Sequence, residues 1–258
     1  MKIHFQKYQG TGNDFVMIDD RNETFDLQNE NLIAKLCDRK FGIGADGLIL
    51  LRHDPNSDFR MIYFNSDGKP SSFCGNGGRC TVKFAESVGM FQGKTKFLAN
   101  DGMHEAYLQD SQIFLKMADV KQIEIQTNDF FLNTGSPHNI IFVENIENFD
   151  VFSEGQKIRY SPRFEKEGSN INFVEKNKDH IFVRTYERGV EDETLSCGTG
   201  VTAAALATAL QFKTASPVHI QTLGGNLRVA FKQVSQQHFE DIYLIGAAQK
   251  VFEGSIEV

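Results

Sequence analysis

The stretches CGNGGRCTVKFAESV (residues 74–88) and CGTGVTAAALATALQF (residues 197–212) decide the fold, because they begin alike and lie 123 positions apart. The same offset, without a gap, aligns four further matches: Thr11-Gly12 with Thr134-Gly135, Phe59 with Phe182, Tyr63 with Tyr186, and Gly102 with Gly225. Solenoid repeats have periods of only about 20–50 residues. The offset therefore predicts a duplicated domain, with two copies of one structural unit in the chain.

Each copy is expected to be a strand-rich shell around one helix. Short runs rich in Phe, Ile and Val, bounded by Gly, Asn, Asp or Pro, predict strands at residues 15–18, 48–51, 60–64, 140–143 and 181–183. A helix-like stretch follows each C-G-x-G, at residues 79–88 and 201–212, and a further helix is predicted over 29–39. The stretch 201–212 is apolar nearly all round, which is typical of a helix buried on all sides.

These patterns predict an α/β (α+β) fold with two similar, pseudo-symmetric domains, each a curled, mostly antiparallel sheet around a central helix. The boundary is expected near residues 117–121, which gives an N-terminal domain of 1–118 and a C-terminal domain of 119–248. The tail, 249–258, lies beyond the second repeat. Its alternating pattern predicts a strand that completes the first domain.

Composition and charge exclude several classes of function. The net charge is −7, from 27 basic and 34 acidic residues, and the basic residues are scattered. Binding to nucleic acid or to an anionic membrane surface needs a basic patch, so neither partner is expected. The N-terminus lacks a signal-peptide core, and no stretch is long and apolar enough to span a bilayer. A cytoplasmic location, where thiols stay reduced, is therefore expected.

The cysteines follow neither a disulfide nor a metal-binding pattern. The chain has four cysteines and no CxxC, and Cys74 and Cys80 lack nearby partners at zinc-like spacing. No metal site is expected. A single cysteine is most often a small buried hydrophobic residue, and this interpretation is kept for Cys37 and Cys80.

Cys74 and Cys197 are interpreted instead as functional residues, because both precede the central helix of their repeat. Free N–H groups and the helix dipole favour negative charge at a helix N-terminus, and they lower the pKa of a cysteine placed there. The adjoining glycine-rich turns, 75–78 and 198–200, leave N–H groups uncovered to bind a carboxylate. If the two halves face each other, one thiolate and one thiol can move a proton from one face of a carbon to the other. The pattern predicts a cofactor-independent amino-acid epimerase.

Two other classes stay open on the cysteines alone. A thiol hydrolase would use one cysteine activated by His138, but it leaves the second C-G-x-G unexplained. A redox-sensing protein would join Cys74 and Cys197 in a reversible disulfide. Such a disulfide is expected here only as an inactivating side reaction of two close, acidic thiols.

Seven motifs make the chain similar to the diaminopimelate epimerase family over essentially its full length. They are GTGNDFVMID (10–19), FGIGADG (41–47), YFNSDG (63–68), FCGNGGRC (73–80), GSPH (135–138), NINF (170–173) and YERGVEDETLSCGTG (186–200). The first, fourth and last are highly specific. The resemblance implies a homodimeric enzyme of lysine and cell-wall precursor biosynthesis that interconverts LL- and meso-diaminopimelate with no metal or cofactor.

The resemblance also assigns roles to residues. Cys74 and Cys197 would be the acid/base pair, and the reacting carboxylate would be held by Gly75, Asn76, Gly198 and Thr199. The remaining substrate-binding positions would be Asn13, Asn65, Asn170, Glu187 and Arg188, several of them at the distal end of the substrate. His138 matches a family position near the thiols, where it would either help to set their protonation or make a structural hydrogen bond.

The chain departs from the family pattern at two positions. Ser136 stands where many members have Asn, and Gly47 stands where many have Gln. The shorter Ser136 is kept as a possible contact, completed by a water molecule, and Gly47 is excluded. A proline or hydroxyproline racemase would share the thiols but would not need the distal residues. A phenazine-pathway isomerase lacks the cysteine pair.

Overall fold

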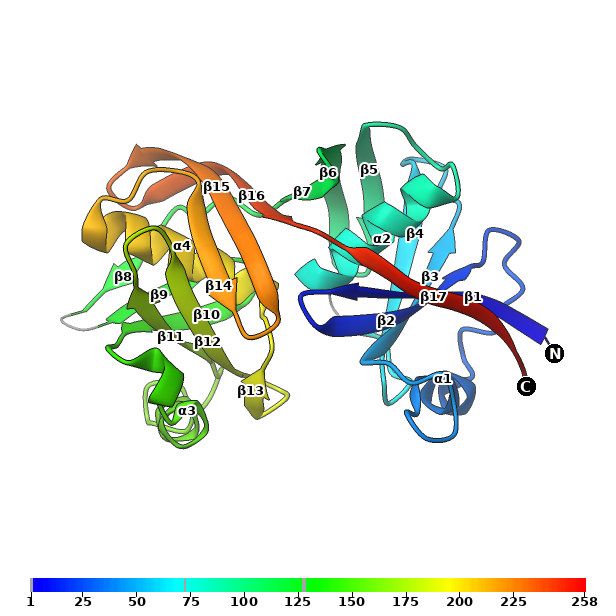
Figure 1. The fold of residues 1–258 in the computed structure, drawn as a ribbon, viewed down its shortest axis with the longest axis horizontal. Coiled ribbons are helices and arrows are strands. Elements are labelled where there is room, and N and C mark those ends of the chain that lie inside the picture. Colours follow the sequence, from blue (N-terminus) through cyan, green and yellow to red (C-terminus); the bar gives the residue numbers. More distant parts are fainter. Residues whose placement is uncertain (1, 72, 127–128) are drawn as a thin grey trace. The chain divides into compact units, whose positions relative to one another are not determined.

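The computed structural model of the chain describes residues 2–71, 73–126 and 129–258 (Figure 1). Met1, which begins the predicted first domain, lies outside the described residues. Contacts divide the chain into two compact units, which we call unit 1 (Met1–Leu115 with Gly246–Val258) and unit 2 (Lys116–Ile245). A compact unit need not fold independently, so domains at 1–118 with 249–258 and at 119–248 remain a proposal.

Unit 1 is a sheet with two helices, α1 (Glu30–Cys37) and α2 (Gly75–Ser87). Its strands are β1 (Lys2–Gly10), β2 (Asn13–Asp19), β3 (Gly47–Arg52), β4 (Phe59–Asn65), β5 (Lys94–Ala99), β6 (Gly102–Gln109), β7 (Gln112–Lys116) and β17 (Gln249–Glu257). They pair in the order β17-β1-β2-β3-β4-β5-β6-β7. Among these pairs of described strands, β2–β3 and β4–β5 are parallel and the others are antiparallel.

Unit 2 repeats this plan with the helices η1 (Ile146–Asn148), α3 (Val151–Arg159) and α4 (Gly198–Phe212). Its strands are β8 (Glu124–Ile125), β9 (Asp129–Asn133), β10 (Pro137–Phe142), β11 (Asn170–Lys176), β12 (Ile181–Glu187), β13 (Asp192–Thr194), β14 (Val218–Thr222), β15 (Gly225–Ser235) and β16 (His238–Gly246). The pairs β10–β11 and β12–β14 are parallel, at the positions that β2–β3 and β4–β5 hold in unit 1. The predicted fold class is confirmed.

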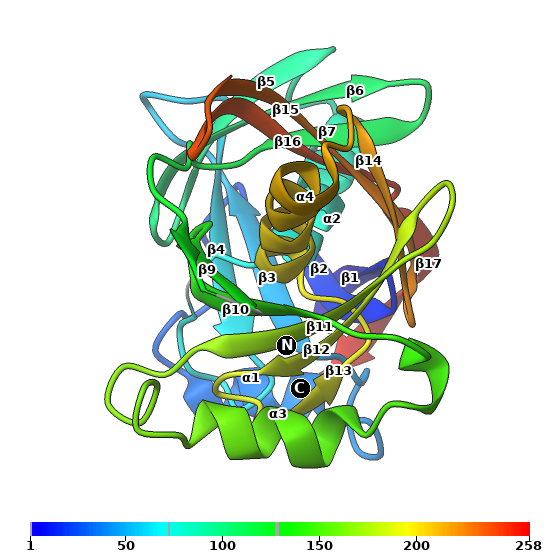
Figure 2. The same ribbon diagram turned by 90° about the vertical axis from the view of Figure 1, so that its left-hand side faces the viewer.

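Each unit wraps its sheet around one helix. Figure 2 shows α4 inside the curve of the unit 2 strands, and it contacts β9, β10, β11, β12, β14 and β15. Val201 and Leu206 on this helix are completely buried, as the apolar sequence requires. In unit 1, α2 contacts β1, β2, β3 and β17. None of the helices in the described ranges has the length and apolar character needed to cross a membrane.

The two central helices begin earlier than predicted, at Gly75 and Gly198 instead of residues 79 and 201. The glycines that were interpreted as turns form the first helical turn, so that prediction was wrong. Close packing explains why glycine occupies these helical positions. A Cβ on Gly78 would lie 2.4 Å from Phe73 Cζ, and one on Gly200 would lie 2.4 Å from Asn172 Oδ1.

The predicted helix at 29–39 is present as the shorter α1, because Asn29 caps it by accepting a hydrogen bond from the Leu32 N–H. Its counterpart in unit 2, α3, was missed. Gly155 interrupts the helical pattern there, and a Cβ at that position would lie 2.4 Å from Tyr186 Cβ. The repeat offset itself could have revealed α3, since it carries residues 29–39 onto 152–162.

Candidate active site

Cys74 lies at the N-terminus of α2 and is partly exposed. It has extended backbone angles (φ −115°, ψ 123°), and its side chain does not cap the helix. The first helical hydrogen bond runs from the Gly78 N–H to the Cys74 carbonyl at 2.7 Å. Helix geometry therefore directs the preceding N–H groups, those of Gly75, Asn76 and Gly77, toward an acceptor outside the helix. Such a terminus suits a thiolate or a carboxylate.

Asn13, at the start of β2, is oriented toward the Cys74 thiol. Its side-chain Nδ2 donates to Asp46 at 2.5 Å, which leaves Oδ1 to accept from the Cys74 S–H at 3.6 Å. Arg39 fixes Asp46 from the other side through a 2.7 Å ion pair. Arg39 also pairs with Asp14 and holds the pKa of that carboxyl to about 2, although burial alone would raise it.

The amide of Asn76 is buried beneath the first turn of α2. Its Oδ1 accepts from the Thr11 hydroxyl at 3.3 Å, and Thr11 accepts in turn from Arg79 Nη2 at 3.1 Å. Thr11 and Arg79 were missed as site residues, although both stand in motifs that the sequence analysis had quoted. Asn65 ends β4 with an exposed side chain, and the structure brings no described side chain into a hydrogen bond with it.

Cys197 occupies the equivalent place at the N-terminus of α4 and is 8 % exposed. Its Sγ lies 3.5 Å from Thr199 Oγ1. The Thr199 carbonyl accepts from the Thr134 hydroxyl at 2.8 Å, which anchors this turn to the end of β9. The hydroxyl of Thr199 also contacts His138, so it lies between the Cys197 sulfur and the His138 ring.

His138 on β10 is completely buried, and its ring lies between the Thr199 hydroxyl and the side-chain amide of Asn172. Its Nε2 lies 2.9 Å from Thr199 Oγ1, and its Nδ1 lies 3.1 Å from Asn172 Nδ2. The Oδ1 of Asn172 accepts from the Thr185 hydroxyl at 2.9 Å. Burial, and to a smaller extent the charge of Arg188, lowers the pKa of His138 to about 3. The imidazole is therefore neutral at physiological pH.

Asn172 and Thr185 were not predicted as site residues. The signal was present in the repeat, because their counterparts 123 positions earlier are Ile49 and Ile62. A polar residue in one copy that replaces a buried aliphatic residue in the other needs a partner. Here the partner is the ring of His138.

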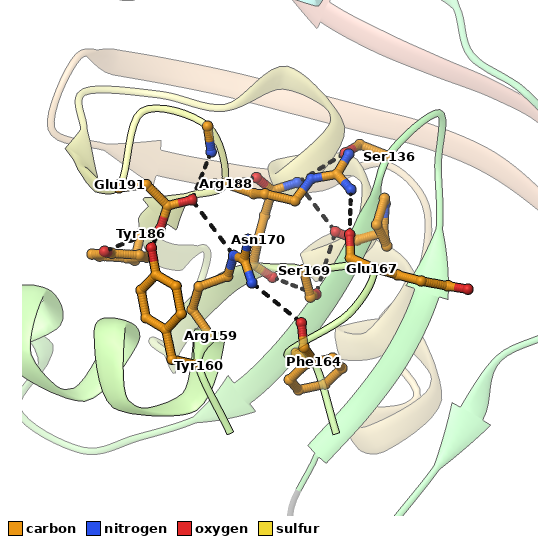
Figure 3. Close-up of polar contacts among 12 residues, drawn as sticks. Ser136, Arg159, Tyr160, Phe164, Glu167, Ser169, Asn170, Tyr186, Arg188 and Glu191 are labelled. Carbon is orange, nitrogen blue, oxygen red and sulfur yellow. Dashed lines mark hydrogen bonds and ion pairs between the residues drawn. The ribbon is translucent and has the colours of Figure 1, made fainter. Parts of the chain in front are cut away.

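Arg188, Asn170 and Ser136 form one cluster at the ends of β10, β11 and β12 (Figure 3). Asn170 Nδ2 donates to Ser136 Oγ at 3.0 Å, and Asn170 Oδ1 accepts from the Arg188 backbone N–H at 2.9 Å. The Arg188 guanidinium donates to the Glu167 carbonyl at 2.7 Å and approaches Ser136 Oγ at 3.5 Å. No described carboxylate pairs with Arg188, whose side chain is exposed. This arrangement leaves a guanidinium available to an anion.

Glu187 ends β12 and makes no ion pair with Arg188 among the described residues. It accepts from the Thr194 hydroxyl at 2.9 Å. Burial raises the pKa of its carboxyl, against the smaller opposite effect of that hydrogen bond. A half-buried carboxylate with one remaining oxygen is suited to accept from an ammonium group.

The other two cysteines lie apart from this chemistry. Cys37 and Cys80 are buried, and burial raises the pKa of each thiol to about 12. Within the described ranges, no group of three or more His, Cys, Asp or Glu side chains is arranged to hold a metal ion.

Comparison with known proteins agrees with the motifs. A sequence model described as diaminopimelate epimerase matches residues 5–120 and 130–251. The diaminopimelate epimerase of Flavobacterium psychrophilum is 54 % identical over 259 residues, which cover 99 % of this chain and 100 % of the relative. That of Chlorobaculum tepidum is 43 % identical, with 96 % of this chain and 98 % of the relative covered.

Solved structures with the same fold have far less similar sequences. A phenazine biosynthesis protein of the PhzF family from Bacillus anthracis matches with a TM-score of 0.77 at 15 % identity, covering 100 % of both chains. A hydroxyproline epimerase from Agrobacterium vitis matches with a TM-score of 0.72 at 12 % identity, covering 99 % of this chain and 92 % of that one. These two show the fold alone, whereas the sequence matches show that the chain belongs to the diaminopimelate epimerase family.

Proposed function

We propose that the chain interconverts LL- and meso-2,6-diaminopimelate, with Cys74 and Cys197 as the two proton-transferring groups. The observation that carries the proposal is the equivalent place of the two cysteines in a family member: each begins the central helix of its unit. Both thiols thus lie at a terminus that favours negative charge. The activity belongs to lysine and peptidoglycan precursor biosynthesis, as the family does.

The reaction moves one proton off the substrate and another onto it. A thiolate takes the α-hydrogen as a proton and becomes a thiol, while the electron pair of the C–H bond stays on the α-carbon and its carboxylate. The other thiol then donates its proton to the opposite face and becomes the thiolate. The pair therefore ends each turnover with its protonation states exchanged, and the proposal requires both thiols to reach the same α-carbon in the substrate complex.

The reacting carboxylate is proposed to bind at the helix N-termini. Its ligands would be N–H groups from two short segments, Gly75-Asn76 and Gly198-Thr199. Negative charge builds on this carboxylate as the α-proton leaves, and fixed N–H dipoles stabilise that charge without a cofactor or a metal. Asn13 would hold the substrate beside Cys74, to which its amide oxygen already points.

The distal amino-acid end is proposed to bind in unit 2. Arg188 would pair with the distal carboxylate, since no described acid neutralises its guanidinium. Glu187 would accept from the distal ammonium, and Asn65 would add a further contact from the end of β4. Asn170 and Ser136 would act mainly by positioning Arg188, because their polar atoms are bonded within the cluster (Figure 3).

His138 is proposed to support Cys197 through Thr199, since its ring contacts that hydroxyl and stays neutral. The protein is proposed to be a cytoplasmic homodimer with a small-molecule amino-acid substrate and no nucleic-acid or membrane partner. Size-exclusion chromatography with light scattering tests the dimer.

The decisive experiment incubates the reduced protein with LL-diaminopimelate in heavy water. Proton NMR follows α-deuteration while chiral chromatography follows stereochemistry. The proposal predicts early meso product that carries deuterium, while the remaining substrate is still protonated. Exchange with proline or another amino acid, but not with diaminopimelate, would keep the thiol mechanism and reject the substrate. No exchange with any amino acid would reject the epimerase.

A further inference from the structure

Gly168 lies between the side chains of two arginines, Arg159 and Arg188. A Cβ at this glycine would lie 2.6 Å from Arg188 Cδ and 2.8 Å from Arg159 Cζ. Its backbone also has a positive φ of 72°, which residues with an L side chain rarely adopt. Any other residue here would therefore be strained and would displace a side chain that carries a guanidinium.

The segment that contains Gly168, residues 160–169 between α3 and β11, is fixed in place. The Gly168 N–H donates to the Phe164 carbonyl at 2.9 Å, and Arg159 Nη1 donates to the same carbonyl at 3.2 Å. The Phe164 side chain is buried and packs in the apolar cluster of unit 2 that contains Ile171. The backbone at residue 168 therefore has little freedom to move away from the arginines.

Arg188 is also held by the residue before Gly168. Its Nη1 donates to the Glu167 carbonyl at 2.7 Å. The Glu167 side chain extends away from both guanidinium groups (Figure 3). Residue 167 thus supplies an acceptor and residue 168 supplies room for Arg188 Cδ, so two consecutive residues determine where this guanidinium lies.

The two guanidinium groups differ in their counter-ions (Figure 3). Arg159 ends α3, where the helix dipole favours a cation, and its Nε lies 3.5 Å from Glu191 Oε1. Burial alone would raise the pKa of the Glu191 carboxyl, but hydrogen bonds from the Gly189 N–H and the Tyr160 hydroxyl help to hold that pKa below its ordinary value. Glu191 is therefore ionised at neutral pH and compensates Arg159. Arg188 is left as the cation without a described acid.

A turn alone explains many glycines with a positive φ, and Gly93 is such a case. Its φ of 74° is nearly that of Gly168, yet with its chain neighbours set aside no described atom lies within 4 Å of its Cβ position. Contact with two arginines therefore distinguishes Gly168 from a glycine that serves a turn only.

We infer that Gly168 is a positioning residue for Arg188, and that the segment 160–169 thereby sets how tightly the distal carboxylate of the substrate is bound. Arg159, compensated by Glu191, supports this segment and leaves the uncompensated positive charge on Arg188. The inference deepens the proposed function and rests on it. It names the part of the chain that makes the site select a substrate with an anionic distal end.

The test compares two alanine substitutions with matched backbone strain. Gly168→Ala should lower kcat/KM for LL-diaminopimelate by about fivefold or more, mainly through a higher KM, because a displaced guanidinium loses part of a charge-assisted contact. Gly93→Ala imposes the same strain in unit 1 without contact to an arginine, and it should leave kcat and KM nearly unchanged. Chiral chromatography gives the initial rates, and circular dichroism checks that each variant is folded.

A double-mutant cycle shows whether Gly168 acts through Arg188. In an Arg188→Met background the guanidinium is already absent, so Gly168→Ala should change kcat/KM by less than about twofold.

Arg159→Met is a second, independent variant. It leaves Glu191 without its partner and free to compete with the substrate for Arg188, so KM should rise. Arg159→Lys keeps a cation and should restore most of the parent KM.

A folded Gly168→Ala protein with the kcat and KM of the parent overturns the inference. So does a loss of activity that multiplies with that of Arg188→Met, since Gly168 would then act elsewhere. If Gly168→Ala does not fold, Arg159→Met decides, and an unchanged KM rejects the inference. The parent is measured first: no turnover of diaminopimelate there rejects the proposed function, whereas a failure confined to the variants rejects this inference alone.

Discussion

His138 Nε2 lies 2.9 Å from Thr199 Oγ1, and the proton between them belongs to the imidazole. Asn172 Nδ2 is within 3.2 Å of the Asn139 carbonyl, which can only accept, so the amide nitrogen must be the atom that faces His138 Nδ1 at 3.1 Å. His138 Nδ1 therefore accepts, and the neutral ring carries its proton on Nε2. Thr199 Oγ1 accepts a hydrogen bond from this N–H and has its own hydroxyl hydrogen left to donate to Cys197 Sγ.

The first prediction reverses this tautomer. Asn172→Asp places an acceptor at His138 Nδ1, so the proton of the neutral ring moves from Nε2 to Nδ1. Thr199 then donates to His138 instead of Cys197, and kcat should fall at least about tenfold, as loss of a stabilising hydrogen bond predicts. Nitrogen-15 NMR of His138 reads the tautomer directly. Thr185→Val, which removes only the hydroxyl donor to Asn172, should change kcat much less; an unchanged tautomer in Asn172→Asp would contradict the relay.

The second prediction concerns the cysteines. Cys74→Ala and Cys197→Ala should each reduce epimerisation by about 10²-fold or more, because each removes a general acid/base. Cys37→Ala is the control, since that thiol is buried with a pKa of about 12 and should leave the rate nearly unchanged. Chiral chromatography measures all three. Full activity in either of the first two variants would favour a thiol hydrolase or another one-cysteine mechanism.

The third prediction compares two equivalent glycines. A Cβ on Gly200 would lie 2.4 Å from Asn172 Oδ1, whereas one on Gly77 would lie 3.2 Å from Ile49 Cδ1, the movable end of a side chain. Gly200→Ala should lower the free energy of unfolding by about 1–3 kcal/mol and reduce kcat. Gly77→Ala should change stability by no more than about 1 kcal/mol, because alanine also favours the helix. Urea denaturation measures both, and equal losses would contradict the packing argument.

The fourth prediction concerns the distal end of the substrate. Arg188→Met should lower kcat/KM for diaminopimelate by about 10- to 100-fold, as expected for a lost charge-assisted contact of about 1.5–3 kcal/mol. The melting temperature should stay nearly unchanged, since Arg188 is exposed and has no described acidic partner. Arg163→Met is the matched control, because Arg163 already pairs with Asp129 and Glu124. If Arg163→Met loses activity while Arg188→Met keeps it, the assignment of Arg188 to the distal carboxylate is rejected.

The fifth prediction is a dependence of stability on pH. Burial lowers the pKa of folded His138 to about 3, below its ordinary value of 6.5, so the unfolded chain binds more protons between these values. The free energy of unfolding should therefore fall as pH decreases from about 6.5 toward 3, and it should not gain from this group above pH 6.5. His138→Gln should weaken that dependence. His4→Gln, at an exposed position, should not, and urea midpoints at pH 5 and pH 7.5 make the comparison.

Much of the fold was evident in the sequence, because the signals that define it are local. Repeated spacing, apolar runs and the all-round apolar stretch 201–212 predicted two similar units with a central helix each, and the structure confirms this fold class. The starts of α2 and α4 were misplaced by a few residues. Glycine was interpreted as a turn former, whereas at Gly78 and Gly200 it makes room for Phe73 and Asn172.

The sequence by itself determined the duplicated unit, the two cysteines at its helices and the family. Only the tertiary structure decided that Arg79 lies buried with no acidic partner among the described residues, and that Asn172 sets the tautomer of His138. Arg79 meets Thr11 from 68 residues away and Asn172 meets His138 from 34. Strand register and the depth of packing bring these groups together, and no local pattern of residues encodes either quantity.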